Sequence, residues 1–127
     1  MIMKTQKDII VVACILGMLG VGIGAFGAHA LKGLSMTNNR LDTFELAVRY
    51  HFYHLLSLLT IGATFQLGNV TFLKWSANLL LVGILLFSGS LYVLAIFNQT
   101  AVAIVTPFGG LFLIASWALA AYGFYKK

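Results

Sequence analysis

Charged side chains are scarce in this sequence and almost absent from its second half. Of 127 residues, only eight are Lys or Arg and three are Asp or Glu. None lies between Asp8 and Lys32, and beyond Arg49 the chain carries only Lys74 before its two final lysines. Hydrophobic residues make up 61% of the chain, too much for a polar exterior to cover in water. The sequence therefore predicts a membrane protein.

The sequence contains a single cysteine and none of the common catalytic patterns. Cys14 is the only cysteine, so a disulfide within the chain is excluded, and we expect Cys14 to be a small buried residue. The sequence shows no Ser-His-Asp arrangement, no phosphate-binding loop and no paired carboxylates expected within the membrane. We therefore expect a protein that is not an enzyme and that holds no cofactor.

Four apolar stretches are long enough to cross a membrane as helices. Each offers about 20 residues or more, enough at 1.5 Å per residue for a hydrocarbon core ~30 Å thick. Within lipid, a helix satisfies all of its backbone hydrogen bonds within one segment. A β-barrel is the other possibility, and four strands are too few to close one. We predict one all-α domain, an antiparallel bundle of four transmembrane helices, with approximate spans 9–31, 41–66, 72–97 and 100–125.

The first stretch also has features of a cleaved signal sequence. Lys4 and Lys7 precede the apolar run, and Ala28-His29-Ala30 has the small-x-small form of a cleavage site. The run is longer than the apolar core of a signal sequence, which has about 7 to 15 residues. Cleavage would also leave an odd number of spans, so we expect the segment to remain as the first helix.

The basic residues are divided unequally between the two ends of the predicted spans. Lys32, Arg40 and Arg49 share one side with the acidic Asp42 and Glu45. Because Lys and Arg accumulate on the cytoplasmic side, we expect both termini in the cytoplasm. This bias accounts for the net charge of +5 without a nucleic-acid partner. The residues on the terminal side are Lys4, Lys7, Lys74, Lys126 and Lys127.

Small residues form stripes along three of the predicted helices. The first and fourth stretches each carry one such stripe, and in the third stretch Gly83 and Gly89 lie on opposite sides. In membranes such residues let helices approach closely. We expect these positions to pack against a helix of the same chain or of a second copy, and the sequence does not decide which. They are Gly17, Gly20, Gly24 and Gly27 in the first stretch, Gly83 and Gly89 in the third, and Gly109, Ser116 and Gly123 in the fourth.

Polar residues follow one face of the second stretch, within about 120° on a helical wheel. Glu45 and Arg49 have the i,i+4 order that favours an ion pair, which would lower the cost of placing Arg49 near hydrocarbon. In one interpretation the first turns lie among headgroups and the hydroxyls bond to carbonyls one turn earlier. In the other, the stripe faces the bundle interior and lines a ligand cavity. The stripe contains Asp42, Glu45, Arg49, Tyr53, Ser57, Thr60 and Thr64.

Three histidines are expected at one membrane depth. His51 and His54 project from the side of the second helix opposite Glu45, and His29 ends the first helix. Three imidazoles can bind a transition metal, and two can hold a haem; a proton-linked role is also open. No Cys, Asp or Glu joins them at ligand spacing, so we assign no metal site.

A proline motif, Thr106-Pro107-Phe108-Gly109-Gly110, interrupts the fourth stretch. Either Thr106 is the N-cap and Pro107 the first helical residue, or the helix begins near Thr100 and is kinked at Pro107. Both interpretations place irregular backbone at or near membrane depth, which sometimes marks a substrate site in transporters.

Several motifs together resemble a known family. The chain contains Gly24-Ala25-Phe26-Gly27-Ala28-His29, then His54-Leu55-Leu56, then Phe87-Ser88-Gly89-Ser90-Leu91-Tyr92, then the proline motif. In this order they resemble the YgdD/YwdK-like family of small four-span membrane proteins. The resemblance implies a four-helix fold in a bacterial inner membrane and no particular biochemical activity.

Three function classes fit these features. We favour a structural, accessory or scaffolding protein that acts through homo-oligomerisation or a membrane partner, because small-residue faces suit association. The alternatives are a small transporter or channel, which requires several copies because four packed helices enclose little space, and a His-based metal or haem redox protein. The expected surroundings are the lipid bilayer, and the candidate functional residues are His29, Glu45, Arg49, His51, Tyr53, His54 and Pro107.

The charge bias makes a topological prediction. A reporter fused after Lys127 should read as cytoplasmic, and the variant Asn38→Cys should react with an impermeant thiol reagent added outside intact cells. Labelling of that cysteine only after permeabilisation would contradict the assignment.

Overall fold

The computed structural model describes residues 1–33 and 40–127. They form the α-helices α1 (Gln6–Gly33), α2 (Arg40–Ala63), α3 (Val70–Phe97) and α4 (Val105–Tyr125) and the short 3-10 helices η1 (Phe65–Leu67) and η2 (Thr100–Ile104). This part of the chain contains no strand, so the all-α prediction is confirmed. Asn38 and the other residues of the first connection, 34–39, lie outside the described residues.

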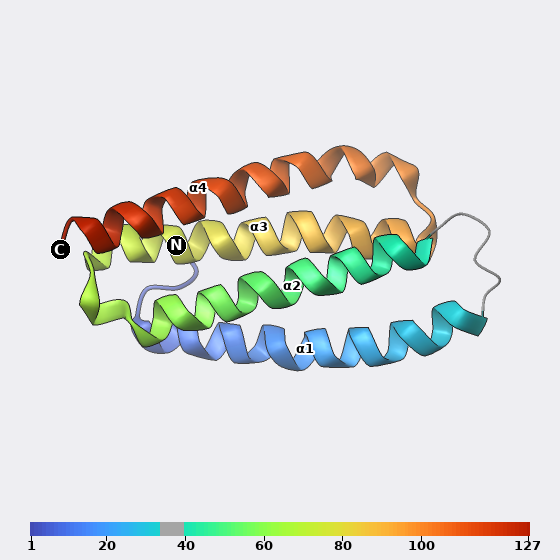
Figure 1. Ribbon diagram of the computed structural model, residues 1–127, viewed down its shortest axis with the longest axis horizontal. Coiled ribbons are helices and arrows are strands. Elements are labelled where there is room, and N and C mark those ends of the chain that lie inside the picture. Colours follow the sequence, from blue (N-terminus) through green and yellow to red (C-terminus); the bar gives the residue numbers. More distant parts are fainter. Residues whose placement is uncertain (34–39) are drawn as a thin grey trace.

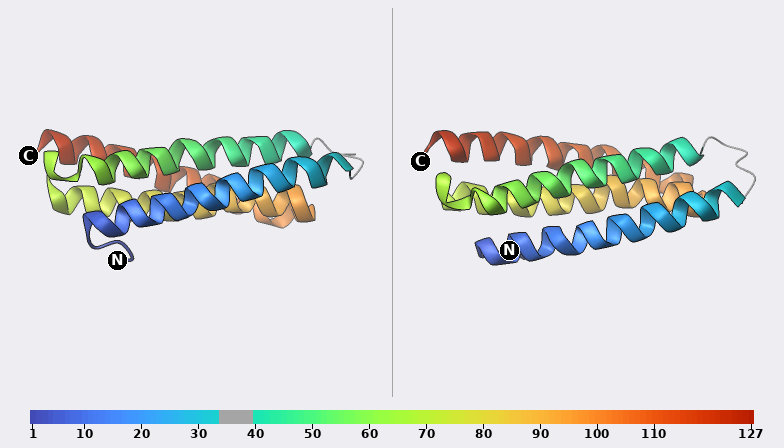
Figure 2. Two further views of the ribbon diagram at one scale, coloured as in Figure 1. Left: turned by 90° about the horizontal axis from the view of Figure 1, so that it is seen from below. Right: turned by 60° about the horizontal axis from the view of Figure 1, so that its bottom comes forward.

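The four α-helices lie side by side in an up-and-down bundle, with α2 and α3 in the centre and α1 and α4 on opposite sides of that pair (Figure 1). α1 packs mainly on α2, α2 on α3, and α3 most extensively on α4. Both chain termini lie in the half of the bundle where α2 ends and α3 begins (Figure 2).

Among the described residues, three helical segments are long and apolar enough to cross a membrane: Gln6–Gly27, Val70–Phe97 and Thr100–Tyr125. α2 does not reach this level of hydropathy, because it carries the polar stripe and two histidines. Its 24 residues nevertheless extend about 36 Å, alongside the other three helices. The result is an α-helical membrane bundle in which one helix is distinctly more polar than its neighbours.

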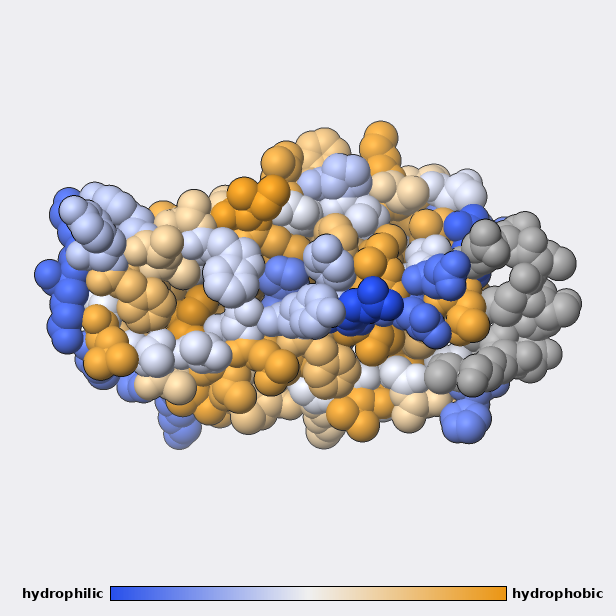
Figure 3. Space-filling view, viewed as in Figure 1, coloured by the Kyte–Doolittle hydropathy of each residue, from blue (hydrophilic) through white to orange (hydrophobic). Residues whose placement is uncertain are grey.

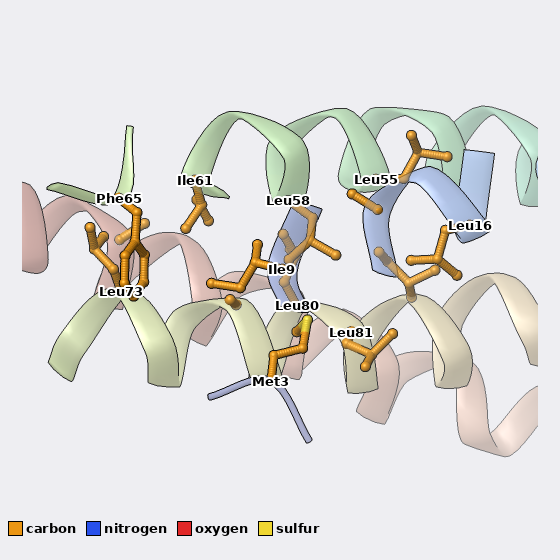
Figure 4. Close-up of a cluster of buried hydrophobic side chains, with 14 of the residues drawn as sticks. Met3, Ile9, Leu16, Leu55, Leu58, Ile61, Phe65, Leu73, Leu80 and Leu81 are labelled. Carbon is orange, nitrogen blue, oxygen red and sulfur yellow. The ribbon is translucent and has the colours of Figure 1, made fainter. Parts of the chain in front are cut away.

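The main apolar core is formed by residues of all four α-helices and includes the segment that precedes α1. Met3 and Ile9 are fully buried and reach between the helices toward Leu58 and Leu80 (Figure 4). α1 is therefore built into the core of the bundle rather than attached to its edge.

Asn78 of α3 holds the N-terminal segment against the bundle. Its Oδ1 accepts hydrogen bonds from the backbone N–H groups of Ile2 and Met3, both at 3.0 Å. Its Nδ2 donates to the carbonyl of Met3 at 2.8 Å. The amide thereby satisfies backbone groups that belong to no helix, which permits Met3 to be buried.

Two small-residue stripes with seven-residue spacing bring α3 and α4 together. Ser76 and Ser116 each donate a hydroxyl hydrogen bond of 2.8 Å to the backbone carbonyl of the other. Farther along, the hydroxyls of Ser90 and Thr106 lie 2.6 Å apart. A seven-residue repeat keeps the same face of each helix toward its partner. The stripes are Ser76, Gly83 and Ser90 in α3, and Gly109, Ser116 and Gly123 in α4.

Four glycines of α1 face α2 of the same chain. A Cβ added at Gly20 would lie 2.9 Å from the ring of Phe52, and one at Gly27 would overlap the ring of Phe44. Gly24 approaches Val48, and Gly17 lies more loosely beside Leu55. These glycines therefore make close contacts inside one chain.

Gly89 departs from this pattern, because a Cβ there would meet nothing within 4 Å. The packing role that we predicted for Gly89 has no partner in the described part of the chain. On α3 the close contacts lie on the Ser76, Gly83 and Ser90 side of the helix.

The contrast between Gly109 and Gly89 gives a test of this packing. A Cβ at Gly109 would overlap the backbone of Phe87, and the backbone of a helix cannot move aside as a side chain can. Gly109→Ala should lower the free energy of unfolding by about 1 to 3 kcal/mol. Gly89→Ala should be neutral or stabilising by up to about 1 kcal/mol, since alanine favours helix. Thermal unfolding in detergent measures both; equal stability of the two variants would contradict the α3–α4 contact.

Candidate functional site

α2 carries polar side chains on two different sides. One side points into the bundle and holds His51 and His54, which are both buried. The other side points outward and holds the stripe predicted from the sequence, which we call the α2 polar face: Asp42, Glu45, Arg49, Tyr53, Ser57, Thr60 and Thr64.

His51 connects three helices. Its Nε2 lies 2.9 Å from the carbonyl of Leu16 in α1, and its Nδ1 lies 2.9 Å from the hydroxyl of Tyr92 in α3. Because a carbonyl only accepts hydrogen bonds, we assign the hydrogen to Nε2, and Nδ1 then accepts from Tyr92. Both ring nitrogens are thus occupied by groups of the chain.

His54 lies at the junction of α2 and α4. Its Nδ1 donates to the carbonyl of Tyr50, one turn earlier, at 2.8 Å. Its ring stacks on Tyr50 and meets Trp117 of α4 edge-on, with ring centroids 5.7 Å and 6.5 Å away. The imidazole therefore acts as a flat packing surface between the helices.

The three histidines do not converge. His29 is exposed near the end of α1, whereas His51 and His54 are buried with separate partners. Among the described residues, no group of three or more His, Cys, Asp or Glu side chains is placed to hold a metal ion. The structure therefore does not support a metal site formed by the three histidines together.

The α2 polar face points away from the bundle. Glu45, Arg49 and Tyr53 are exposed, and hydrophilic atoms run along the middle of an otherwise largely apolar surface (Figure 3). The interpretation in which this stripe faces the bundle interior is therefore wrong. The predicted ion pair is also not formed, since the structure shows no hydrogen bond or ion pair between Glu45 and Arg49, both described residues.

The hydroxyl groups of this face bond to their own helix. Ser57 donates to the carbonyl of Tyr53 at 2.7 Å, and Thr60 to that of Leu56 at 2.8 Å. Thr64 donates to Thr60 at 2.7 Å. The predicted bonding to carbonyls one turn earlier is thus confirmed, and these groups keep only acceptor capacity for other partners.

A shallow groove borders the C-terminal half of the α2 polar face. It lies between α2 and α4 and has a volume of about 400 Å³. Tyr53, Ser57 and Thr60 form one wall, and Trp117 and Phe124 belong to the other. The groove is mostly apolar, so its chemistry differs from that of the charged end of the face.

Pro107 is the third residue of α4, which follows directly on η2. Thr106 is therefore inside the helix and is not its N-cap, and Ile104 occupies the position before the helix. In the first turn the missing N–H of a proline leaves no hydrogen bond unmade. The chain accommodates Pro107 through a 3-10 turn that continues into the α-helix.

Some hydrogen bonds between side chains and backbone groups could not be predicted from the sequence. Ser88 donates to the carbonyl of Ala47 in α2 at 2.9 Å, and Asn78 binds the N-terminal segment. Their partners are backbone groups, which any residue type supplies. Cys14, expected to be buried, is exposed on the outer side of α1.

The comparison with known proteins settles the family. Residues 23–110 match the family described as "Protein of unknown function (DUF423)". The chain belongs to this family. The match includes the C-terminal part of α1, all of α2 and α3, and the proline motif at the start of α4.

Relatives in three bacteria cover nearly the whole chain. The UPF0382 membrane protein SH2409 of Staphylococcus haemolyticus is 38% identical over 90% of this chain and 92% of its own length. The Bacillus subtilis protein YwdK is 38% identical over 90% and 93%. The Escherichia coli K12 inner membrane protein YgdD is 35% identical over 94% and 90%. No solved structure gives a significant match. The resemblance drawn from the motifs is confirmed, and this DUF423 chain is a membrane protein.

The buried histidines allow a matched test of the geometry. In a double-mutant cycle, His51→Phe and Tyr92→Phe should couple by about 0.6 to 1.7 kcal/mol, the range of hydrogen bonds between membrane helices. The control cycle of His54→Phe with Tyr92→Phe should be additive, because the two side chains share no partner. Thermal unfolding in detergent measures both cycles, and coupling through His54 instead of His51 would invalidate the hydrogen-bond assignment.

Proposed function

We propose that this protein is a non-catalytic accessory protein of the bacterial inner membrane, which acts by associating with other membrane-embedded chains through the α2 polar face. The observation that carries the proposal is the position of Arg49. It is exposed and lies nine residues, or about 14 Å, from the start of a helix of 24 residues. A cation therefore faces outward within the middle third of α2.

Exposure of this kind is costly in lipid. On insertion scales an arginine at the centre of a transmembrane helix costs about 2.5 to 3.5 kcal/mol. Its long side chain recovers part of this by extending toward the headgroups. A protein surface that supplies acceptors would recover more, because it replaces lipid around the guanidinium. The α2 polar face is thus better suited to a protein neighbour than to acyl chains.

The other outward surfaces suit lipid. Met18 of α1, Leu85 of α3 and Ile114 of α4 are each large, apolar and exposed. The glycine faces are already used in contacts inside the chain. Within the described residues, the α2 polar face is therefore the outward helix face with charge at membrane depth.

The proposed location and orientation rest on separate support. The relative YgdD is named an inner membrane protein, and the lysine bias supports a cytoplasmic location for both termini. The two termini lie in the same half of the bundle, as this orientation requires (Figure 2).

Transport across the membrane receives weaker support from the same face. A polar pathway between copies needs groups that exchange hydrogen bonds with a solute. Ser57 and Thr60 direct their protons to their own helix, and the groove beside them is mostly apolar.

Cysteine cross-linking in native membranes tests the association. In a Cys14→Ser background, Tyr53→Cys places a thiol on the α2 polar face and Leu85→Cys places one on α3. The two native side chains are 56% and 55% exposed, so thiols at these sites should collide with lipid-borne reagents equally often. Oxidation with copper phenanthroline should give a cross-linked product for Tyr53→Cys and little for Leu85→Cys.

The mass of the product identifies the neighbour. A product of twice the chain mass indicates self-association, and any other mass indicates a different membrane protein. Equal yields at the two sites would mean random collision and would overturn the proposal.

A further inference from the structure

We infer that the neighbour is a second copy of this chain, docked so that Glu45 of each copy pairs with Arg49 of the other. The inference rests on the proposed association through the α2 polar face and names its partner. Two unpaired, opposite charges one turn apart on a single exposed face are the juxtaposition that carries it.

The charges of this face find no partner within the described chain. Glu45 and Arg49 are exposed and unbridged, and Asp42 lies exposed one turn earlier. Arg40, the other basic residue of α2, donates to Asn98 at the end of α3 at 2.8 Å. It is thereby directed toward α3 and away from the acidic groups of the face.

The pattern is complementary to itself under the symmetry that a membrane allows. Copies inserted in one orientation are related by a two-fold axis along the membrane normal, so two α2 helices meet in parallel. Along the helix axis, Glu45 then lies about 6 Å closer to the N-terminal end of α2 than Arg49 of the partner subunit. Side chains on a helix lean toward its N-terminus, which extends each arginine toward the carboxylate of the other copy. Two equivalent ion pairs result.

Charge also argues for a second copy over an anionic lipid. A lipid phosphate that approached Arg49 would meet the carboxylates of Asp42 and Glu45 on the same face, which carries one positive and two negative charges. A second copy brings an arginine for Glu45 and a carboxylate for Arg49 at once. From Tyr53 to the C-terminal end of α2 the face carries no charge. Its hydroxyls donate to carbonyls of their own helix, so two copies can approach there.

Two complementary variants test the pairing. Arg49→Glu leaves two carboxylates at these positions, and Glu45→Arg leaves two guanidinium groups. Each variant alone should self-associate at least about tenfold more weakly than the wild type, because like charges then oppose each other. Produced together with different affinity tags, the two variants should co-purify, since every pair across the interface is again of opposite sign. Extraction in native nanodiscs preserves the bilayer.

The mixed pair separates this inference from simpler explanations. A pair formed inside one chain is lost in both variants and cannot be restored by mixing them. Two tagged copies of the same variant are the control for non-specific recovery. Helical content and thermal unfolding show that each variant folds. If charge reversal unfolds the chain, Arg49→Gln and Glu45→Gln should each weaken self-association. The mixed pair of these two variants keeps one Glu45–Arg49 ion pair, so it should associate more strongly than either variant does with itself.

The outcomes are distinct. Recovery of the mixed pair at the wild-type level supports the reciprocal pairing. Recovery no greater than that of the same-variant control overturns it, as does a wild-type chain that is monomeric in nanodiscs. If the Tyr53→Cys variant nonetheless cross-links to a different protein, the proposed association stands and the second-copy partner fails.

Discussion

The structure depends on one constraint: inside lipid a polar group finds no water, so its partner must come from the protein. Among the described residues, no buried side-chain nitrogen or oxygen lacks a hydrogen-bond partner. The bonds that meet this constraint also connect the helices. His51 joins α1, α2 and α3, and the reciprocal bonds of Ser76 and Ser116 join α3 to α4. The hydrogen bonds that satisfy the buried polar groups therefore also determine which helices are neighbours.

The same constraint explains how α2 can be more polar than the other helices and still lie within the membrane bundle. Its buried histidines each meet a carbonyl, and its outward hydroxyls are bonded to the turn before them. What remains is the charged end of the α2 polar face, where Glu45 and Arg49 are exposed. The part of α2 that the chain itself does not satisfy is the part to which we assign an association role.

The sequence predicted helices and faces better than partners. Periodicity identified the small-residue stripes, because a wheel gives directions about a helix axis. It could not show that Gly20 meets Phe52 or that Ser76 meets Ser116, because the wheel contains no second helix. Asn78 was not predicted as an anchor, since its partner is the backbone of Ile2 and Met3. For α2 both sides are polar, and composition alone does not tell which side turns inward.

The open arrangement of the helices leaves the α2 polar face accessible to a neighbouring molecule. In a closed square bundle the first and last helices would touch and each helix would have two neighbours. Here α1 and α4 lie on opposite sides of the central pair (Figure 1), and between them the α2 polar face is left uncovered (Figure 3). Because close packing through glycine is already used inside the chain, any further contact at this face depends on polar pairing. The chain thus separates two tasks: small residues build the bundle, and charge remains available for what the bundle meets.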